Sequence, residues 1–409
     1  MSKNIAVIGA GAIGLCSAWH LQQSGARVTI FEMNEVGNGA SWGNAGQILP
    51  SKSVPLSDPA NLKYALRSFL KKNSPITAPR NFDADLIKYL ATFTRNSTKK
   101  NHHIGSNSMW SLGKMAFDEY EVMELAGVIT TRKEGPFTAA FKNSKTSYSL
   151  IDELDRARKS FPDLDFDLLN QSQLLSNEPL LDERFTFGVR LKKQFYLNPP
   201  AFLHNLSSFL IQREIELVTK KKIIDIESTH NGVKLIAKNG DHYYFDAVVI
   251  ATGAWLNRLT GQHGVKHPVI AGIGYSLSVD VPHQTQGMLY LPEMRLATTN
   301  YRDKLRISTF MQMTDVETPF NAVRMNRLIE MAKKELPKAK WDSAGDYWSG
   351  GRPLSGDGKP LIGGTKSQGV FVNSGHGMWG ITLAPISGRL ISDLILKGKA
   401  ISKEFDPLR

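Results

Sequence analysis

The 409-residue sequence contains a single cysteine, Cys16, and fewer acidic residues than basic ones. One thiol excludes an internal disulfide framework and a cysteine-rich zinc or iron–sulfur site, and it fits a reducing compartment. Fifty Lys and Arg against 38 Asp and Glu leave a formal charge of +12. Hydrophobic residues at 41% and charged residues at 22% argue against a disordered, collagen-like or membrane-spanning chain. The length predicts two to three domains.

A long uninterrupted apolar run is also missing. Residues 4–26 carry His20 as their one ionisable side chain, as a signal peptide or a membrane span would. Three glycines interrupt this stretch, however, and it ends in polar residues. Hydrophobic periodicity instead predicts a buried strand at 5–8, a helix at 12–23 and a second buried strand at 28–31. We therefore expect a βαβ unit here.

The glycine spacing inside this unit is typical of a dinucleotide-binding turn. Gly9, Gly11 and Gly14 follow the pattern G-x-G-x-x-G between the first strand and the helix. We expect Gly9 to make the tight turn, Gly11 to let a pyrophosphate approach the backbone, and Gly14 to let the helix pack closely on the strand. Glu32 closes the second strand, where a carboxylate can accept from a ribose hydroxyl. The alternative is a plain glycine-rich turn.

Further blocks point to a flavin. Residues 37–46 form a small-residue loop that is suited to close contact with a flat ring. The predicted strand at 245–250 runs into Ala-Thr-Gly-Ala-Trp, residues 348–364 contain G-x-R-P and D-G-x-P, and residues 373–385 contain G-H-G. In these blocks the sequence resembles the FAD-dependent D-amino acid oxidase superfamily, and most of all its bacterial D-amino acid dehydrogenase subgroup (small-subunit type).

The resemblance implies an α/β fold, namely a Rossmann-type FAD-binding domain (GR2-like flavoprotein) with a second α+β substrate domain built on an antiparallel sheet. We expect residues 1–57, 190–262 and 346–409 to form the FAD-binding domain, and residues 58–189 and 263–345 the substrate or cap domain.

The resemblance also implies non-covalent FAD, because Cys16 lies in the first helix, near the pyrophosphate end rather than the ring. The ten histidines leave a histidyl link open. By the family's pattern, the cofactor is expected to contact Gly9, Gly11, Ala12, Ile13, Gly14, Glu32, Met33, Ser41, Ala45, Gly46, Ile48, Ile223, Thr252, Gly253, Gly377, Met378, Gly380 and Thr382. No metal site is expected.

Arg352, the arginine of G-x-R-P, is the candidate ligand of the substrate carboxylate. The family uses this arginine for that role, and a guanidinium matches a carboxylate with two parallel hydrogen bonds. The alternative is a structural ion pair with an acid such as Asp357. Tyr275 is a candidate lining residue by its match to the subgroup's Gly-Tyr-Ser, or it packs on a sheet. His376 is a possible acid or base, although the family uses that loop mainly through its backbone.

The activity implied is oxidative deamination of a D-amino acid by hydride transfer from the α-carbon to flavin N5. The products would be a 2-oxo acid and ammonia, and the electrons would pass to a quinone or another acceptor. The alternatives are oxidation of glycine or a secondary amine (sarcosine, an opine, hydroxyproline), a tRNA-modifying flavoprotein, and a non-catalytic flavin-binding protein. Glycine oxidases of the superfamily carry an arginine where this chain has Met378 and Trp379, so that second carboxylate clamp is missing.

The basic excess is local, because nine basic and two acidic residues give residues 59–103 a charge of +7. The basic residues are Lys63, Arg67, Lys71, Lys72, Arg80, Lys88, Arg95, Lys99 and Lys100. Apolar residues from Leu62 to Leu70 have helical spacing, which predicts a basic amphipathic helix able to lie on an anionic membrane, or else an ordinary helix with solvated charges. We expect a cytoplasmic protein in peripheral contact with the inner membrane. Nucleic acid is not expected, because the segment lacks an RNA-binding module.

Overall fold

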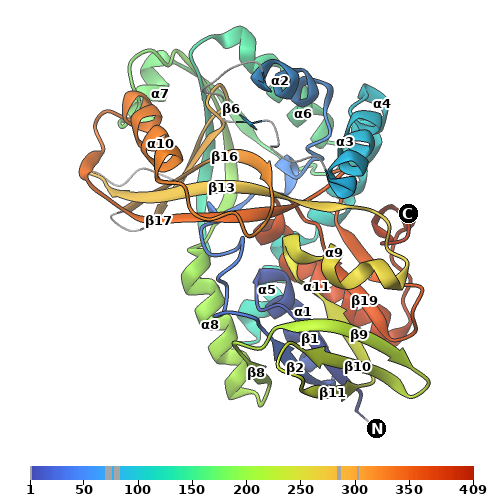
Figure 1. The fold of residues 1–409 in the computed structure, drawn as a ribbon. Coiled ribbons are helices and arrows are strands. Elements are labelled where there is room, and N and C mark those ends of the chain that lie inside the picture. Colours follow the sequence, from blue (N-terminus) through green and yellow to red (C-terminus); the bar gives the residue numbers. More distant parts are fainter. Residues whose placement is uncertain (1, 70–75, 78–82, 283–286, 302–303) are drawn as a thin grey trace.

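The structure is a computed structural model that describes residues 2–69, 76–77, 83–282, 287–301 and 304–409. Leu70, Lys71, Lys72 and Arg80 lie outside these described residues. Figure 1 shows two large sheets, with the strands around β1 in the lower half and β13, β16 and β17 crossing the upper half. In the described ranges, no helix combines the length and the apolar character that crossing a membrane requires.

The lower sheet has six strands in the order β18-β19-β12-β1-β2-β8. Their bounds are β1 Asn4–Ile8, β2 Arg27–Phe31, β8 Glu216–Val218, β12 Ala247–Ile250, β18 Leu361–Gly364 and β19 Val370–Ser374. All neighbours are parallel except β18, which is antiparallel to β19. With α1 at Ala12–Gln23, the predicted βαβ unit is confirmed. Parallel strands buried on both faces explain the continuous apolar runs in the sequence.

Helix α11 (Gly380–Lys397) packs against α1. The two cross so closely that a Cβ on Gly388 would lie 2.7 Å from the main chain of Cys16. Pro385 inside α11 has no N–H to donate to the carbonyl of Ile381. The Tyr120 hydroxyl, from α5 (Ala116–Leu125), donates to that carbonyl at 2.7 Å and satisfies it.

The upper sheet has ten strands, eight of them in the order β17-β13-β16-β15-β14-β5-β7-β3. Strand β4 pairs with β16, and β6 pairs with β7. Their bounds are β3 Gln47–Ile48, β4 Ile76–Thr77, β5 Lys133–Phe141, β6 Phe166–Asn170, β7 Phe187–Tyr196, β13 Val269–Asp280, β14 Met288–Leu291, β15 Leu296–Tyr301, β16 Lys304–Thr314 and β17 Lys340–Ser355. The pairings are antiparallel except β14 with β5 and β16 with β4. The predicted antiparallel sheet is therefore present, and it includes two parallel pairs.

Helices cover the faces of this sheet, and a small sheet of β9, β10 and β11 lies beside β1 and β12 (Figure 1). The remaining bounds are α2 Pro59–Phe69, α3 Ala84–Asn96, α4 Lys99–Gly113, α6 Tyr148–Ala157, α7 Gln171–Asn177, α8 Pro199–Gln212, α9 Asn257–Thr260, α10 Ala322–Glu335, β9 Ile223–Thr229, β10 Gly232–Ala237 and β11 His242–Phe245. Two expected domain boundaries, at 189/190 and 345/346, fall inside β7 and β17. By sheet membership, residues 190–196 and 346–355 belong with the ten-stranded sheet, because hydrogen-bonded strands form one unit.

Candidate active site

The turn between β1 and α1 has the geometry that its glycines predict. Gly9 has a φ of +107°, and a Cβ there would lie 2.6 Å from the carbonyl oxygen of Ala251. A Cβ on Gly14 would lie 1.8 Å from the carbonyl oxygen of Gly9, so Gly14 permits the close contact of helix and strand. A Cβ on Gly11 would meet a single neighbour, the Ser41 hydroxyl, at 3.3 Å. Gly11 therefore borders open space that a phosphate can enter.

Glu32 lies directly after β2, beside this turn. Its carboxylate accepts hydrogen bonds from the main-chain N–H groups of Ala10 at 2.8 Å and Asn34 at 2.9 Å. These bonds hold the carboxylate at the wall of a cavity, where its remaining lone pairs can accept from ribose hydroxyls.

The cavity extends from the glycine turn to β17 and encloses about 1480 Å³, including its open mouth. Because its lining runs from the glycine turn to Arg352, an elongated dinucleotide can lie along it with a substrate at the Arg352 end. The predicted residues that line it are Gly9, Gly11, Ala12, Ile13, Glu32, Met33, Ser41, Ile223, Thr252, Gly253, Arg352, Gly377 and Gly380. The structure thus brings together residues from three distant parts of the chain.

The other predicted site residues do not line this cavity: Gly14, Ala45, Gly46, Ile48, Met378, Thr382 and Tyr275. Four of them support its wall instead. The carbonyl of Ala45 accepts from the Tyr301 hydroxyl. A Cβ on Gly46 would lie 2.0 Å from the carbonyl oxygen of Leu197. Ile48 is buried in β3, and Thr382 donates to the carbonyl of Gln47 at 3.2 Å. Met378 is 39% exposed.

Arg352 reaches the cavity from β17 across β13. Its partner in the strand register is Gly272, and its guanidinium lies over Gly274, where a Cβ would be 2.0 Å from Nη1. Nη1 donates to the carbonyl oxygen of Phe310 at 2.8 Å, and Nη2 donates to the Ser308 hydroxyl at 3.3 Å. Burial lowers the pKa of Arg352 to about 10, so the group is charged at neutral pH.

In the part of the chain that the structure describes, no carboxylate forms an ion pair with Arg352. Asp357, the suggested structural partner, is held by Arg409 through bonds of 2.8 and 3.0 Å and lies 3.4 Å from His267. Burial alone would raise the pKa of Asp357, but Arg409 and His267 hold that pKa well below its ordinary value. The charge of Arg352 is therefore available to an anionic ligand at the cavity wall.

Tyr275 is not in the site, which corrects the prediction that it lines the pocket. It is fully buried on the opposite face of β13, where its ring meets Phe310 edge-on and contacts Phe320. Successive residues of a strand point to opposite faces, and the face of Gly274 belongs to the Arg352 guanidinium. Tyr275 therefore packs in the core, which was the alternative open at the level of sequence.

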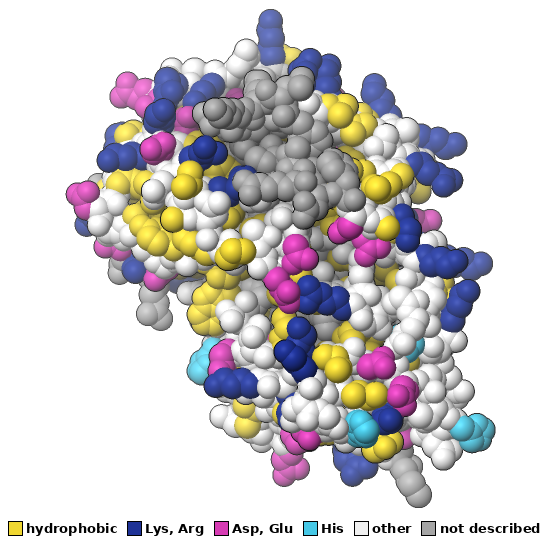
Figure 2. Space-filling model, viewed as in Figure 1, with side chains coloured by type: hydrophobic (Ala, Val, Ile, Leu, Met, Phe, Trp, Pro, Cys, Tyr) yellow, Lys and Arg dark blue, Asp and Glu magenta, His cyan; other side chains and the backbone are white. Residues whose placement is uncertain are grey.

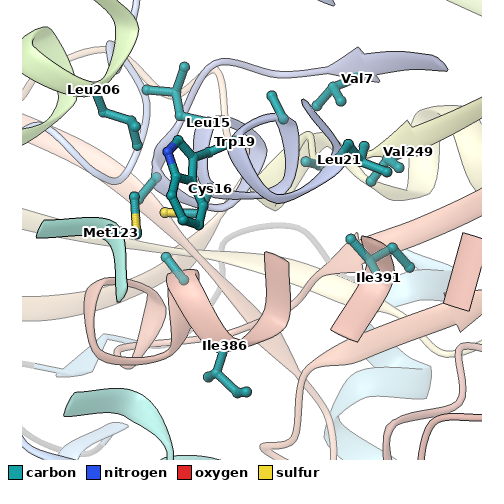
Figure 3. Close-up of a cluster of buried hydrophobic side chains, with 14 of the residues drawn as sticks. Val7, Leu15, Cys16, Trp19, Leu21, Met123, Leu206, Val249, Ile386 and Ile391 are labelled. Carbon is teal, nitrogen blue, oxygen red and sulfur yellow. The ribbon is translucent and has the colours of Figure 1, made fainter. Parts of the chain in front are cut away.

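Burial makes the His376 side chain a poor base and keeps the Cys16 thiol from ionising. His376 lines the cavity, but burial lowers its pKa to about 3, so it is neutral and a very weak base at pH 7. Its Nε2 lies 3.1 Å from the Ser387 hydroxyl, which donates to the carbonyl of Leu383. Burial also strongly raises the pKa of the Cys16 thiol, which lies among Leu15, Trp19 and Met123 in the core (Figure 3).

Sequence reasoning missed the polar and cationic side chains at the Glu32 end of the cavity, among them Lys221, Lys222 and Arg258. Lys221 pairs with Asp241 at 2.6 Å, and Arg258 pairs with Glu317 at 2.6 Å. The run of three lysines before β9 was a usable signal, since β9 was already expected to pass the nucleotide. Arg258 gave no such signal, because α9 reaches the cavity only through the tertiary fold.

Comparison with known proteins agrees with this geometry. A family model described as "FAD dependent oxidoreductase" (DAO) matches residues 4–394. The chain belongs to the DAO family of FAD-dependent oxidoreductases.

Proteins similar to this chain in sequence or fold have different names. A D-amino acid dehydrogenase of Rhizorhabdus wittichii is 24% identical over 399 residues, which are 96% of this chain and 95% of that protein. Glycine oxidase of Geobacillus kaustophilus has a TM-score of 0.75 at 22% identity, covering 100% and 99% of the two chains. L-proline dehydrogenase of P. horikoshii has a TM-score of 0.71 at 17% identity, covering 100% and 97%.

The residues of the cavity fit the FAD that this family uses. The space beside Gly11 and the N-terminus of α1 at Ala12 suit a pyrophosphate, and the Glu32 carboxylate suits a ribose. Toward Arg352, the wall is formed by backbone-rich segments around Gly253 and Gly377, which leave room for a ring system. The protein is therefore an FAD-dependent oxidoreductase whose site can accept an amino acid.

Proposed function

We propose that this DAO-family protein is a dehydrogenase that oxidatively deaminates a D-amino acid. The observation that carries the proposal is Arg352, a charged and partly buried guanidinium at the cavity wall with no carboxylate partner in the described residues. A substrate carboxylate supplies the missing anion, and the two-pronged guanidinium fixes its orientation. The distant D-amino acid dehydrogenases support the choice of substrate.

In this proposal the chain's own residues act by positioning. Arg352 holds the carboxylate, and so sets the α-carbon at a defined distance from the wall formed by Gly253 and Gly377. When bound there, FAD would supply the acceptor for the hydride of that carbon. The amine nitrogen's lone pair forms the C=N bond as the hydride leaves, and water then yields a 2-oxo acid and ammonia. A neutral amine needs no strong base, which agrees with the low pKa of His376, about 3.

We also propose that FAD is held without a covalent bond. The single thiol, Cys16, is buried in the core beside α11, and its sulfur is absent from the cavity lining. His376 is the one histidine among the lining residues of the described chain, and its Nε2 is hydrogen-bonded to Ser387.

The electron acceptor in this proposal is a quinone, reached at a membrane surface formed by α2, α3 and α4. Lys63, Arg67, Lys88, Arg95, Lys99 and Lys100 are exposed there and form no ion pair with a described carboxylate. Figure 2 shows Lys and Arg side chains projecting from the edge of the molecule over α3 and α4. Leu66 in α2 and Ile87 in α3 are 58% and 56% exposed. Cations mixed with apolar side chains match an anionic bilayer, here on the cytoplasmic side.

Replacing Arg352 tests the function. Arg352→Met should keep the flavin spectrum and raise the KM for the amino acid by about 100-fold, because a buried ion pair with the carboxylate is lost. In the unchanged protein, the KM calculated for the neutral-amine form of the substrate should rise above about pH 10, as the guanidinium, whose pKa burial lowers to about 10, loses its proton.

The control is Arg306→Met. The Arg306 guanidinium is also buried in this sheet, but it donates to Ser278 and to the carbonyl of Asp346 and is absent from the cavity lining. Its loss should change KM by no more than about threefold. Substrates are screened by anaerobic bleaching of the flavin with D- and L-amino acids, glycine, sarcosine and hydroxyproline. Bleaching by none of them, or an unchanged KM in Arg352→Met, would contradict the proposal.

A further inference from the structure

Strand β16 contains a β-bulge directly beneath Arg352. Going along β13, Ile273 pairs with Gln312 and Tyr275 pairs with Thr309. Two steps on β13 thus match three steps on β16, so Phe310 and Met311 together lie opposite Gly274. A bulge of this kind bends the strand and turns its backbone groups away from the regular ladder.

The bulge places Phe310 in an unusual backbone conformation. Its φ is +67°, in the left-handed region where glycine is common and a bulky side chain is rare. The first position of such bulges often carries glycine for this reason. Phe310 is 8% exposed, and its ring packs edge-on against Tyr275, with ring centroids 6.2 Å apart. Burial of the ring on one face of the sheet therefore holds a strained backbone in place.

On the other face, the strained residue presents its carbonyl to Arg352. The Phe310 oxygen accepts from Nη1 at 2.8 Å, whereas a regular antiparallel ladder directs carbonyls along the sheet toward a neighbouring strand. Ser308 holds Nη2 at 3.3 Å, and glycine at 274 leaves the space that the guanidinium fills. Both acceptors are neutral. They orient the guanidinium, leave its charge uncompensated, and leave three of its five N–H donors without a hydrogen bond to a described residue.

We infer that Phe310 is a positioning residue for substrate binding. Its ring, anchored against Tyr275, fixes the bulge, and the bulge fixes the carbonyl that aims Arg352 at the substrate carboxylate. The inference rests on the proposed function, in which Arg352 binds that carboxylate. It also gives Tyr275 a role, since this tyrosine acts on the site through the sheet rather than from inside the pocket.

The test uses benzoate as a carboxylate probe of Arg352 and monitors its binding through changes in the flavin spectrum. Steady-state kinetics of the FAD-loaded enzyme are measured in parallel. Phe310→Gly removes the anchor but accepts the positive φ, so the carbonyl is no longer held in one direction. The benzoate Kd and the amino acid KM should both rise about tenfold, the size of one hydrogen bond to a charged group, while kcat stays within about threefold. Ser308→Ala should raise both constants about threefold, and Tyr275→Leu should act in the same direction as Phe310→Gly.

Phe185→Leu is the matched control. Phe185 is buried in the same hydrophobic cluster but contacts Lys142, and its replacement should leave the benzoate Kd unchanged. An Arg352→Met enzyme that still binds benzoate normally would refute the proposed function. Loss of benzoate binding in Arg352→Met, with wild-type affinity in Phe310→Gly and Tyr275→Leu, would overturn the positioning role alone. If Phe310→Gly retains no flavin, a wild-type Kd in Tyr275→Leu overturns it equally.

Discussion

Burial shifts the pKa values of single side chains in opposite directions. Burial lowers the pKa of Arg352 to about 10 and that of His376 to about 3, so at neutral pH the first is charged and the second is not. Burial raises the pKa of Glu178, at the end of α7, to about 7, although the nearby Thr138 hydroxyl and the charge of Arg190 act against the shift. Of these groups, Glu178 titrates in the physiological range.

Glu178 should therefore make folding stability depend on pH. Its raised pKa means that the folded state holds the proton more tightly than the unfolded state, where the pKa is near 4.5. The resulting stability is present below about pH 4.5 and is lost as pH rises to about 7. Glu178→Gln removes this titration. It should have little effect on the free energy of unfolding at about pH 5 and should stabilise the protein by about 2–3 kcal/mol at about pH 8.

Urea unfolding of both proteins at these two pH values measures the difference. Glu183→Gln, an exposed glutamate in the loop after α7, is the control and should give no pH-dependent change. An equal effect of Glu178→Gln at both pH values would show that Glu178 is ionised throughout.

At the scale of single helices and turns, local sequence patterns predicted the features that depend only on neighbouring residues. The period of the apolar residues gave α1 its bounds, Ala12–Gln23, and the glycine spacing gave the turn before it. The sequence did not show on which face of β13 the Tyr275 side chain lies, because that depends on how β13 pairs with β16 and β17. The bulge at Phe310 was equally hidden, since an aromatic residue in an alternating run predicts a regular strand.

The contact between α1 and β1 can be broken by one methyl group. A Cβ on Gly14 would lie 1.8 Å from the carbonyl oxygen of Gly9, and neither main chain can yield without opening the turn. Gly14→Ala should therefore lower the FAD content of the purified protein by at least about tenfold, because the pyrophosphate site depends on this turn.

The control is Gly261→Ala, where a Cβ has nothing within 4 Å and FAD content should be unchanged. Flavin absorbance is read before and after acid precipitation. Flavin that stays with the precipitate would contradict non-covalent binding, and a Gly14→Ala protein with full flavin would contradict the packing argument.

At the scale of the whole molecule, the small-residue loop at residues 37–46 and the strand β3 after it are held by the distant strands of the ten-stranded sheet. The Ser276 hydroxyl donates to the carbonyl of Gly43 at 2.9 Å, and the Gln47 amide donates to the carbonyl of Thr298 at 3.1 Å. The Trp348 ring of β17 lies directly against this loop, since a Cβ on Gly43 would lie 2.1 Å from that ring. These contacts join residues more than 200 positions apart. No local pattern carries such information, so the sequence could predict the loop but not what positions it.

The charge distribution is also a property of the whole molecule, and it leads to a prediction about membranes. Lys88 in α3 and Lys99 and Lys100 in α4 are exposed and have no ion pair in the described chain. Each lysine near an anionic bilayer contributes about 1 kcal/mol. Replacing all three by Gln should weaken co-sedimentation with phosphatidylserine vesicles by about 100-fold at low salt.

The matched control replaces Lys333, Lys334 and Lys340, which are exposed at the far end of α10 and the start of β17. These changes remove the same charge but should leave vesicle binding within about threefold, because they keep the cations of α2, α3 and α4 and the exposed Leu66 and Ile87 intact. Binding should also fall steeply with salt, as the Debye length shrinks from about 30 Å at 0.01 M to about 8 Å at 0.15 M. Equal losses of vesicle binding in the two triple variants would show that binding depends on net charge and not on the α2–α4 surface. Binding to neutral but not to anionic vesicles would exclude an electrostatic contact.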